Sequence, residues 1–149
     1  MAKLVVDSTE PVSGVVRQSA WYTKLLTCVR RVLASKKKID FTVILVEDEA
    51  IKKLHTAYLK RSKITDVLSF FYPAEGAETR DQGELFISLP QGRRQAKRYN
   101  TSLQQEMARL VIHGALHVYG YDHMTPKDRR EMFARAKDIG DCAKKARLC

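Results

Sequence analysis

The pattern of hydrophobic and polar residues switches along this chain between a period of two and a period near 3.6. Short runs rich in β-branched and aromatic residues predict strands, at Lys3–Val6, Ile39–Val46, Asp66–Tyr72 and Glu84–Leu89. Apolar residues three or four positions apart predict helices, at Ser19–Ala34, Asp48–Tyr58, Pro90–Arg98, in a long stretch that includes Ala108–Tyr119, and from Thr125 onward. The order βαβαββααα predicts a mixed α/β fold, with a small mixed sheet of about four strands packed against helices.

Several of these helices carry residues that favour helix ends. Asp48 is a good N-cap for the second helix, and Thr101-x-x-Gln104 resembles a capping box before the long helix. Gly120 is placed to end the long helix as its C′ residue, and Thr125 is placed to cap the last helix. These signals therefore set the expected boundaries of the helical elements.

Three of the chain's four histidines lie in one stretch, HGALHVYGYDH, from His113 to His123. Its helical part is apolar on nearly all sides, so we expect a central, buried helix. His113 and His117 are four residues apart and share one face of that helix. A turn at Gly120 would let His123 reach the same point. Three His ligands with an open fourth position are typical of a catalytic zinc site, so we predict one Zn²⁺ per chain, although three imidazoles also accept nickel or copper.

This stretch also allows two other interpretations. The imidazoles could be hydrogen-bonded core side chains, but three of four histidines at a known ligand spacing favour a metal. The spacing H-x3-H-x2-G-x2-H is also that of the metzincin proteases, which carry a general-base Glu directly after the first His. Gly114 occupies that position here, so the protease base is absent. Asp122 either orients an imidazole or shapes the turn.

Positive charge dominates the composition. The chain has 149 residues, which predicts a single domain over residues 1–149, with 27 Lys and Arg against 17 Asp and Glu and a net charge of +10. The basic residues occur in bursts, at Lys36–Lys38, Lys60–Lys63, Arg93–Arg98, Lys127–Arg130 and Lys144–Arg147. Such a surface attracts polyanions, with nucleic acid or the ribosome as the first candidates. The alternative is that the basic residues only keep the surface soluble or form a basic tail.

The remaining features indicate a cytosolic protein that does not enter a membrane. The sequence begins MAKLVVDSTEPVSG, without the apolar core of a secretory signal, and its apolar stretches are too short to span a bilayer. Three cysteines without a CxxC pair argue against a disulfide framework and against a Cys-ligated zinc site. We expect Cys28 in the core, whereas Cys142 and Cys149 lie in a polar tail.

Three motifs resemble those of one known family. HGALHVYGYDH is similar to the H-G-x-L-H-x-x-G-Y-D-H signature of the YbeY family, bacterial metal-dependent endoribonucleases of rRNA maturation. ITDVLSFFYP resembles the family's T-D-V-L-S-F strand, and QGELFISLP resembles its G-D/E-I-x-I strand. The resemblance runs from about Leu54 to Thr125. It implies a zinc ion on His113, His117 and His123, cleavage of single-stranded RNA, action at the 3′ end of small-subunit rRNA and in ribosome quality control, and RNA and the small ribosomal subunit as partners.

One position departs from the family pattern and keeps other functions open. The family carries an Arg, held to be functional, where this chain has Leu59. Arg61, with Lys60 as runner-up, could supply a cation to a phosphoryl transition state, so the candidate catalytic residues are His113, Arg61 and Lys60. The lost Arg leaves a non-catalytic, zinc-containing ribosome-assembly factor as the alternative to an endoribonuclease. A metzincin-like peptidase is a weaker alternative because of Gly114.

Overall fold

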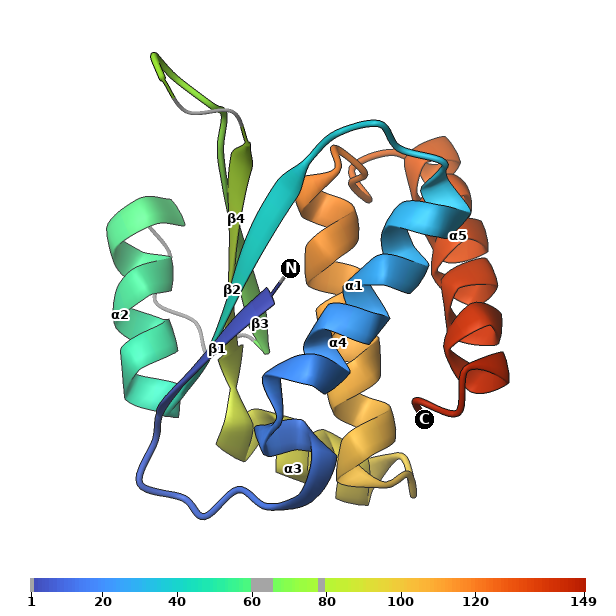
Figure 1. The fold of residues 1–149 in the computed structure, drawn as a ribbon. Helices are drawn as coiled ribbons and strands as arrows, with labels where there is room; N and C mark the ends of the chain where they lie inside the picture. Colours follow the sequence, from blue (N-terminus) through green and yellow to red (C-terminus); the bar gives the residue numbers. More distant parts are fainter. Residues whose placement is uncertain (1, 60–65, 78–79) are drawn as a thin grey trace.

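A four-stranded sheet lies at the centre of the computed structural model, which describes residues 2–59, 66–77 and 80–149 (Figure 1). The strand order is β1-β2-β4-β3, where β1 (Ala2–Asp7), β2 (Ile39–Val46) and β4 (Asp81–Ser88) are parallel. The edge strand β3 (Val67–Tyr72) is antiparallel to β4. The predicted mixed α/β fold with a small mixed sheet is therefore confirmed. β4 begins at Asp81 rather than Glu84, because its first residues continue the parallel pairing with β2.

Helices cover both faces of the sheet (Figure 1). α1 (Ser19–Leu33) and α4 (Leu103–Val118) pack on one face, and α5 (Pro126–Lys145) packs against both as an outer layer. α2 (Asp48–Leu59) lies on the opposite face. The short 3-10 helix η1 (Gly14–Arg17) precedes α1, and α3 (Leu89–Arg98) follows β4 and packs against α4. None of the helices in the described ranges combines the length and apolar character needed to cross a bilayer.

The larger hydrophobic core lies between the sheet and the helices α1, α4 and α5. It contains Tyr22, Leu85 and Leu116, all fully buried. A smaller cluster around Ile51 and Leu68 lies under α2. The long helix α4 is buried along most of its length, as its apolar sequence predicted. It is therefore the element whose position is most constrained by packing.

The three cysteines all contact the larger core. Cys28 is buried there, as predicted, and Cys142 and Cys149 pack against the same core although the sequence placed them in a polar tail. The reason is that α5 buries an apolar side, which includes Ile139 and Ala143. All three are free thiols, and burial together with the neighbouring Cys142 raises the pKa of Cys28 to about 12. The Cys28 thiol is thus protonated and unreactive near neutral pH.

The capping box of α4 lies one residue later than predicted. The N-cap is Ser102, whose hydroxyl accepts from the backbone N–H of Gln105 at 3.1 Å, and the Gln105 side chain accepts from the Ser102 N–H at 3.0 Å. Thr101 lies one residue before the cap: its N–H donates to the carbonyl of Ala96 at the end of α3, and the helix begins at Leu103, directly after Ser102. The pattern Thr101-x-x-Gln104 therefore marked the correct boundary with the wrong pair of residues.

The other predicted caps have mixed outcomes. Thr125 caps α5 as expected, since its hydroxyl accepts from the backbone N–H of Asp128 at 3.1 Å. Asp48 lies inside α2 instead of capping it. Its carboxylate accepts from the hydroxyl of Ser88 at 2.7 Å and from Arg94 at 2.9 Å. Asp48 therefore ties α2 to the junction of β4 and α3.

Gly114 is a point of close approach between α4 and the sheet. A β carbon added at this position would lie 3.0 Å from Val67 Cγ2 and 3.1 Å from Leu85 Cδ2. The hydroxyl of Ser69 also donates to the Gly114 carbonyl at 2.8 Å. Any other residue here would require these neighbours to shift, so glycine suits the close approach of the helix to β3 and β4.

Gly114→Ala should destabilise the fold by about 1–3 kcal/mol, because the extra methyl group overpacks a tight contact. Denaturant unfolding measures the change. Gly140→Ala in α5 is the matched control, since its added β carbon meets nothing within 4 Å, and it should be neutral or slightly stabilising. A Gly114→Ala protein as stable as the wild type would show that this contact does not fix the helix.

Candidate metal centre

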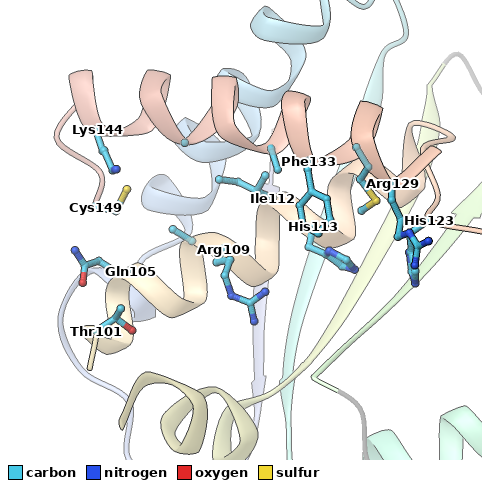
Figure 2. A pocket seen from close by; sticks show the side chains of 14 residues that line it. Thr101, Gln105, Arg109, Ile112, His113, His123, Arg129, Phe133, Lys144 and Cys149 are labelled. Atoms are coloured by element: carbon cyan, nitrogen blue, oxygen red, sulfur yellow. The ribbon is translucent and has the colours of Figure 1, made fainter. Parts of the chain in front are cut away.

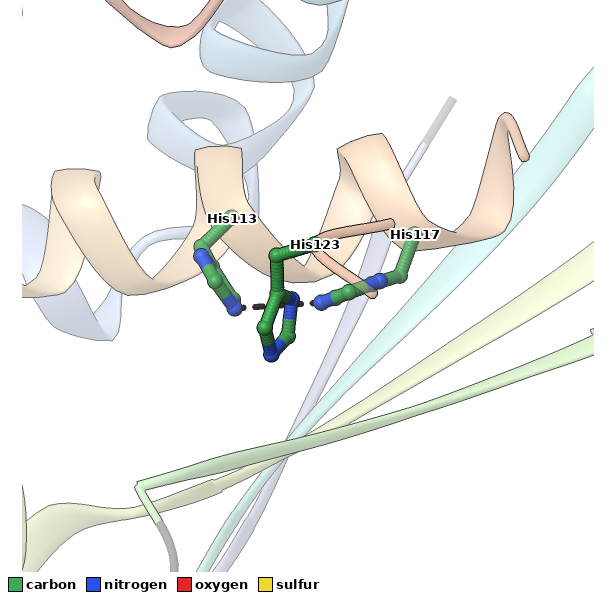
Figure 3. A group of neighbouring side chains, drawn as sticks. All are labelled: His113, His117 and His123. Carbon is green, nitrogen blue, oxygen red and sulfur yellow. Dashed lines mark hydrogen bonds between the residues drawn. The ribbon is translucent and has the colours of Figure 1, made fainter. Parts of the chain in front are cut away.

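His113, His117 and His123 come together at the end of α4 (Figure 3). One ligand nitrogen of each imidazole lies within 4.8 Å of the others. His113 and His117 are partly buried on α4, and His123 is exposed just beyond it. The structure therefore brings together the three side chains that the sequence singled out, with one open side toward solvent.

A Schellman motif after α4 turns the chain back toward the two helix histidines. Gly120 has a φ of +98°, a backbone conformation that glycine adopts without strain. Its N–H donates to the carbonyl of His117, and the Tyr121 N–H donates to the carbonyl of Leu116, both at 3.0 Å. Gly120 thus ends the helix as predicted, and the reversal places His123 beside the other two imidazoles.

A backbone hydrogen bond fixes which nitrogen of His117 is available as a ligand. Nδ1 of His117 lies 2.9 Å from the carbonyl oxygen of Tyr121, and since a carbonyl only accepts, Nδ1 carries the proton. This leaves the lone pair of Nε2 facing His113, at 3.1 Å from its Nε2. Asp122 instead shapes the turn, because its carboxylate accepts from the Met124 N–H at 3.1 Å.

Burial keeps the two helix imidazoles neutral. Desolvation, followed by the charge of His117, lowers the pKa of His113 to about 4, and Asp66 opposes this shift. Desolvation also lowers the pKa of His117. Metals bind the neutral form of imidazole, so both side chains are in the ligand form near pH 7.

The spacing of the His113 and His117 nitrogens suits a tetrahedral transition metal. Two imidazoles that bind one zinc ion at about 2.0–2.1 Å hold their nitrogens roughly 3.3 Å apart, and the Nε2 atoms of His113 and His117 are 3.1 Å apart. His123 would be the third donor, and its exposed side leaves space for a fourth. In the described part of the chain, the cluster that could hold a metal ion consists of these three histidines.

The position after the first histidine lies in a tightly packed contact. Metzincin proteases place Glu there, whereas Val67, Leu85 and Ser69 surround Gly114 here. A Glu at this position would require these neighbours or α4 to shift. The packing therefore disfavours the metzincin base at this position.

Arg109 is a cation beside the site that sequence reasoning missed. It lies four residues before His113 and so shares a face of α4 with His113 and His117. Its guanidinium donates to the buried carboxylate of Glu106 at 2.6 Å and lies 3.6 Å from the carboxylate of Asp66. Its side chain is half exposed and lines the same cavity as His113. The sequence does contain a signal for Arg109: it lies four residues before His113, so it continues the spacing of His113 and His117 by one helical turn.

The predicted catalytic cations Lys60 and Arg61 lie outside the described residues, so their roles stay predictions. Asp66, in the motif that follows them, has its carboxylate near Arg109 and accepts from the Val67 N–H at 2.9 Å. The middle of α4 and the start of β3 therefore meet where Arg109 faces Asp66, one helical turn before His113.

Comparisons with known proteins agree with one another. A family model described as Endoribonuclease YbeY matches residues 7–143. A Bacillus cereus (strain ATCC 10987 / NRS 248) protein named Endoribonuclease YbeY is 35% identical over 147 residues, which cover 90% of each chain. A longer Myxococcus xanthus (strain DK1622) protein of the same name is 39% identical over 104 residues, which cover 68% of this chain and 35% of that one. The solution structure of TM1509 from Thermotoga maritima is similar with a TM-score of 0.62 and 25% identity, covering 99% of this chain and 92% of that one.

The purified protein should contain about one transition-metal ion per chain, as elemental analysis by mass spectrometry would measure. The double variant His113→Ala/His117→Ala should lose it, because two of three donors are removed. His55→Gln is the matched control, since His55 lies on α2 at the other face of the sheet, and it should keep the metal. Full metal content in the double variant would contradict the site.

Proposed function

Because this chain belongs to the YbeY endoribonuclease family, we propose that it is a zinc-dependent endoribonuclease that cleaves single-stranded RNA. The proposed substrate is rRNA at the 3′ end of the small subunit, with a role in ribosome quality control. The proposed partners are therefore RNA and the small ribosomal subunit. The observation that supports this function best is the meeting of three imidazoles at one point of a chain with a net charge of +10.

Some residues of the site would bind the metal, and others orient the residues that bind it. His113, His117 and His123 would bind the ion through one nitrogen each. The Tyr121 carbonyl keeps the proton of His117 on Nδ1, which leaves Nε2 free for the metal. Zinc on three imidazoles supplies, when bound, a water whose pKa is lowered to about 7. The exposed side of His123 is the route by which a phosphodiester would approach.

Cations must stabilise the phosphate during cleavage, because negative charge grows on its non-bridging oxygens. We assign this role to Arg61, with Lys60 as runner-up, since a guanidinium offers a planar pair of donors to phosphate oxygens. Arg109 adds a positive charge beside His113. Its pairs with Glu106 and Asp66 hold it in place. It is therefore better suited to binding a flanking phosphate than to moving with the phosphate that reacts.

The surplus of basic residues would hold the rest of the strand through its phosphates. Attraction of this kind acts on every RNA sequence and weakens as salt rises. It therefore explains affinity for RNA but gives no selectivity for unpaired strands.

A ribosome-assembly factor with a structural metal is the second candidate. It is favoured by one observation, Leu59 in place of the family's Arg. A metzincin-like peptidase is disfavoured by the packing around Gly114. Cleavage assays with different substrates separate the three functions.

Labelled single-stranded RNA should be cut by the purified protein, and a chelator should abolish the cutting, because the nucleophile depends on the metal. Labelled casein, digested in parallel with and without chelator, should stay intact. RNA that is bound but not cut would favour the assembly factor. Chelator-sensitive turnover of casein, lost in His113→Ala, would favour the peptidase.

Arg61→Ala should lower kcat for single-stranded RNA by about 10²–10³ at unchanged metal content, the typical effect of removing a donor to a developing charge. Lys60→Ala should have a smaller effect. Arg135→Ala is the control, since Arg135 is exposed on α5, and it should cleave at the wild-type rate. An unchanged rate in the Arg61→Ala/Lys60→Ala double variant would refute both assignments.

A further inference from the structure

A cavity of about 560 Å³ extends from the three-histidine site along the groove between α4 and α5 (Figure 2). His113 and His123 line one end of it. Lys144 and Cys149 line the other end, where the chain terminates. Arg129 and Lys144 are about four helical turns apart on α5, or roughly 22 Å. The groove is therefore long enough to follow a chain-like ligand away from the metal site.

The walls of this groove are mainly apolar. The side chains and the glycine that form them are Ala108, Ile112, Met132, Phe133, Ala136 and Gly140. Ile112 and Met132 are buried at its base, but the Phe133 ring is 72% exposed. Because most of the ring is exposed, it contributes little to the core and is available to stack on a planar ligand.

Unpaired positive charge lies at both ends of this apolar surface. Arg129 lines the groove near the histidines and Lys144 lines its other end, and neither forms an ion pair with the residues that the structure describes. Arg109 also lines the groove, paired with Glu106 and Asp66, and no acidic residue lines it within the described ranges. A ligand that combines flat apolar groups with repeated negative charges matches this lining, which is the chemistry of a nucleotide chain.

Gly140 keeps the groove open. It lies inside α5, where glycine weakens a helix relative to alanine. A β carbon built on it meets nothing within 4 Å, so packing does not require a glycine there. A larger side chain would instead project into the groove and fill it.

We propose that the groove between α4 and α5 binds unpaired nucleobases of the RNA strand whose phosphate lies at the three histidines. This inference rests on the proposed function and adds a source of selectivity for single strands. Bases stack on Phe133 while flanking phosphates contact Arg109, Arg129 and Lys144. A paired strand has its bases turned into the duplex, so it cannot use the apolar wall.

The test compares the binding of two short single-stranded RNAs. They have the same backbone, but one carries a run of abasic nucleotides in place of intact ones. Fluorescence anisotropy with the full-length protein, on RNA shown by gel to remain intact, gives the two affinities. The wild type should bind the intact RNA on the order of tenfold or more tightly, as expected from base–aromatic stacking. Phe133→Ala and Gly140→Leu should bind both RNAs equally.

Ala134→Leu is the matched control, since Ala134 is exposed on α5 and does not line the groove. It should keep the preference for intact RNA. The unfolding temperature of each variant shows whether it is folded. Gly140→Leu should unfold at or above the wild-type temperature, because leucine is a better helix former than glycine.

Equal binding of both RNAs by the wild type would overturn the proposal, and so would an undiminished preference in Gly140→Leu. The groove could instead bind a second copy of the chain, seen as dimerisation in sedimentation, or a membrane, seen as binding to vesicles of anionic lipid. If either were lost in Gly140→Leu and the wild type showed no base preference, the groove would belong to that occupant and the proposal would be overturned. Because the experiment measures binding, its result does not depend on whether the protein cleaves RNA. A base preference without any cleavage would support the groove alone, and cleavage without a base preference would refute only the groove.

Discussion

The site depends on how closely α4 lies against the sheet. At Gly114 the helix backbone approaches Val67 and Leu85 so closely that an added β carbon would lie 3.0–3.1 Å from them, and the Ser69 hydroxyl donates to the Gly114 carbonyl from the sheet side. This contact fixes the rotation of the helix about its axis. A shift by one residue would turn every side chain by about 100°, so the direction of His113 follows from the packing of its neighbour.

The same burial sets the chemistry of the site. Desolvation keeps His113 and His117 neutral, which is the state that binds a metal ion, and the Tyr121 carbonyl selects the free nitrogen of His117. Around this neutral centre lie cations and an apolar groove with Phe133 at its edge. Under the proposed function, a metal would bind the phosphate, the cations its neighbours and the aromatic ring a base of a single RNA strand.

The sequence predicted the strands, the helices and the meeting of three imidazoles, because these follow from local periodicity and from a four-residue spacing. It misplaced the α4 cap by one residue, since Thr101 and Ser102 are both good cap residues and the local pattern does not say after which of them the helix begins. It missed the role of Gly114 in packing, and it missed Arg109. Both depend on which part of the sheet α4 faces, and a single sequence does not contain that contact.

X-ray absorption at the zinc edge on the purified protein tests the central claim most directly. If three imidazoles on α4 and its following turn hold the metal with one open position, the spectrum should show three nitrogen neighbours and one oxygen neighbour at about 2.0–2.1 Å, with the multiple scattering of imidazole rings. In His123→Ala one of the imidazole contributions should disappear. A shell that contains sulfur, or one that the loss of His123 leaves unchanged, would contradict the account.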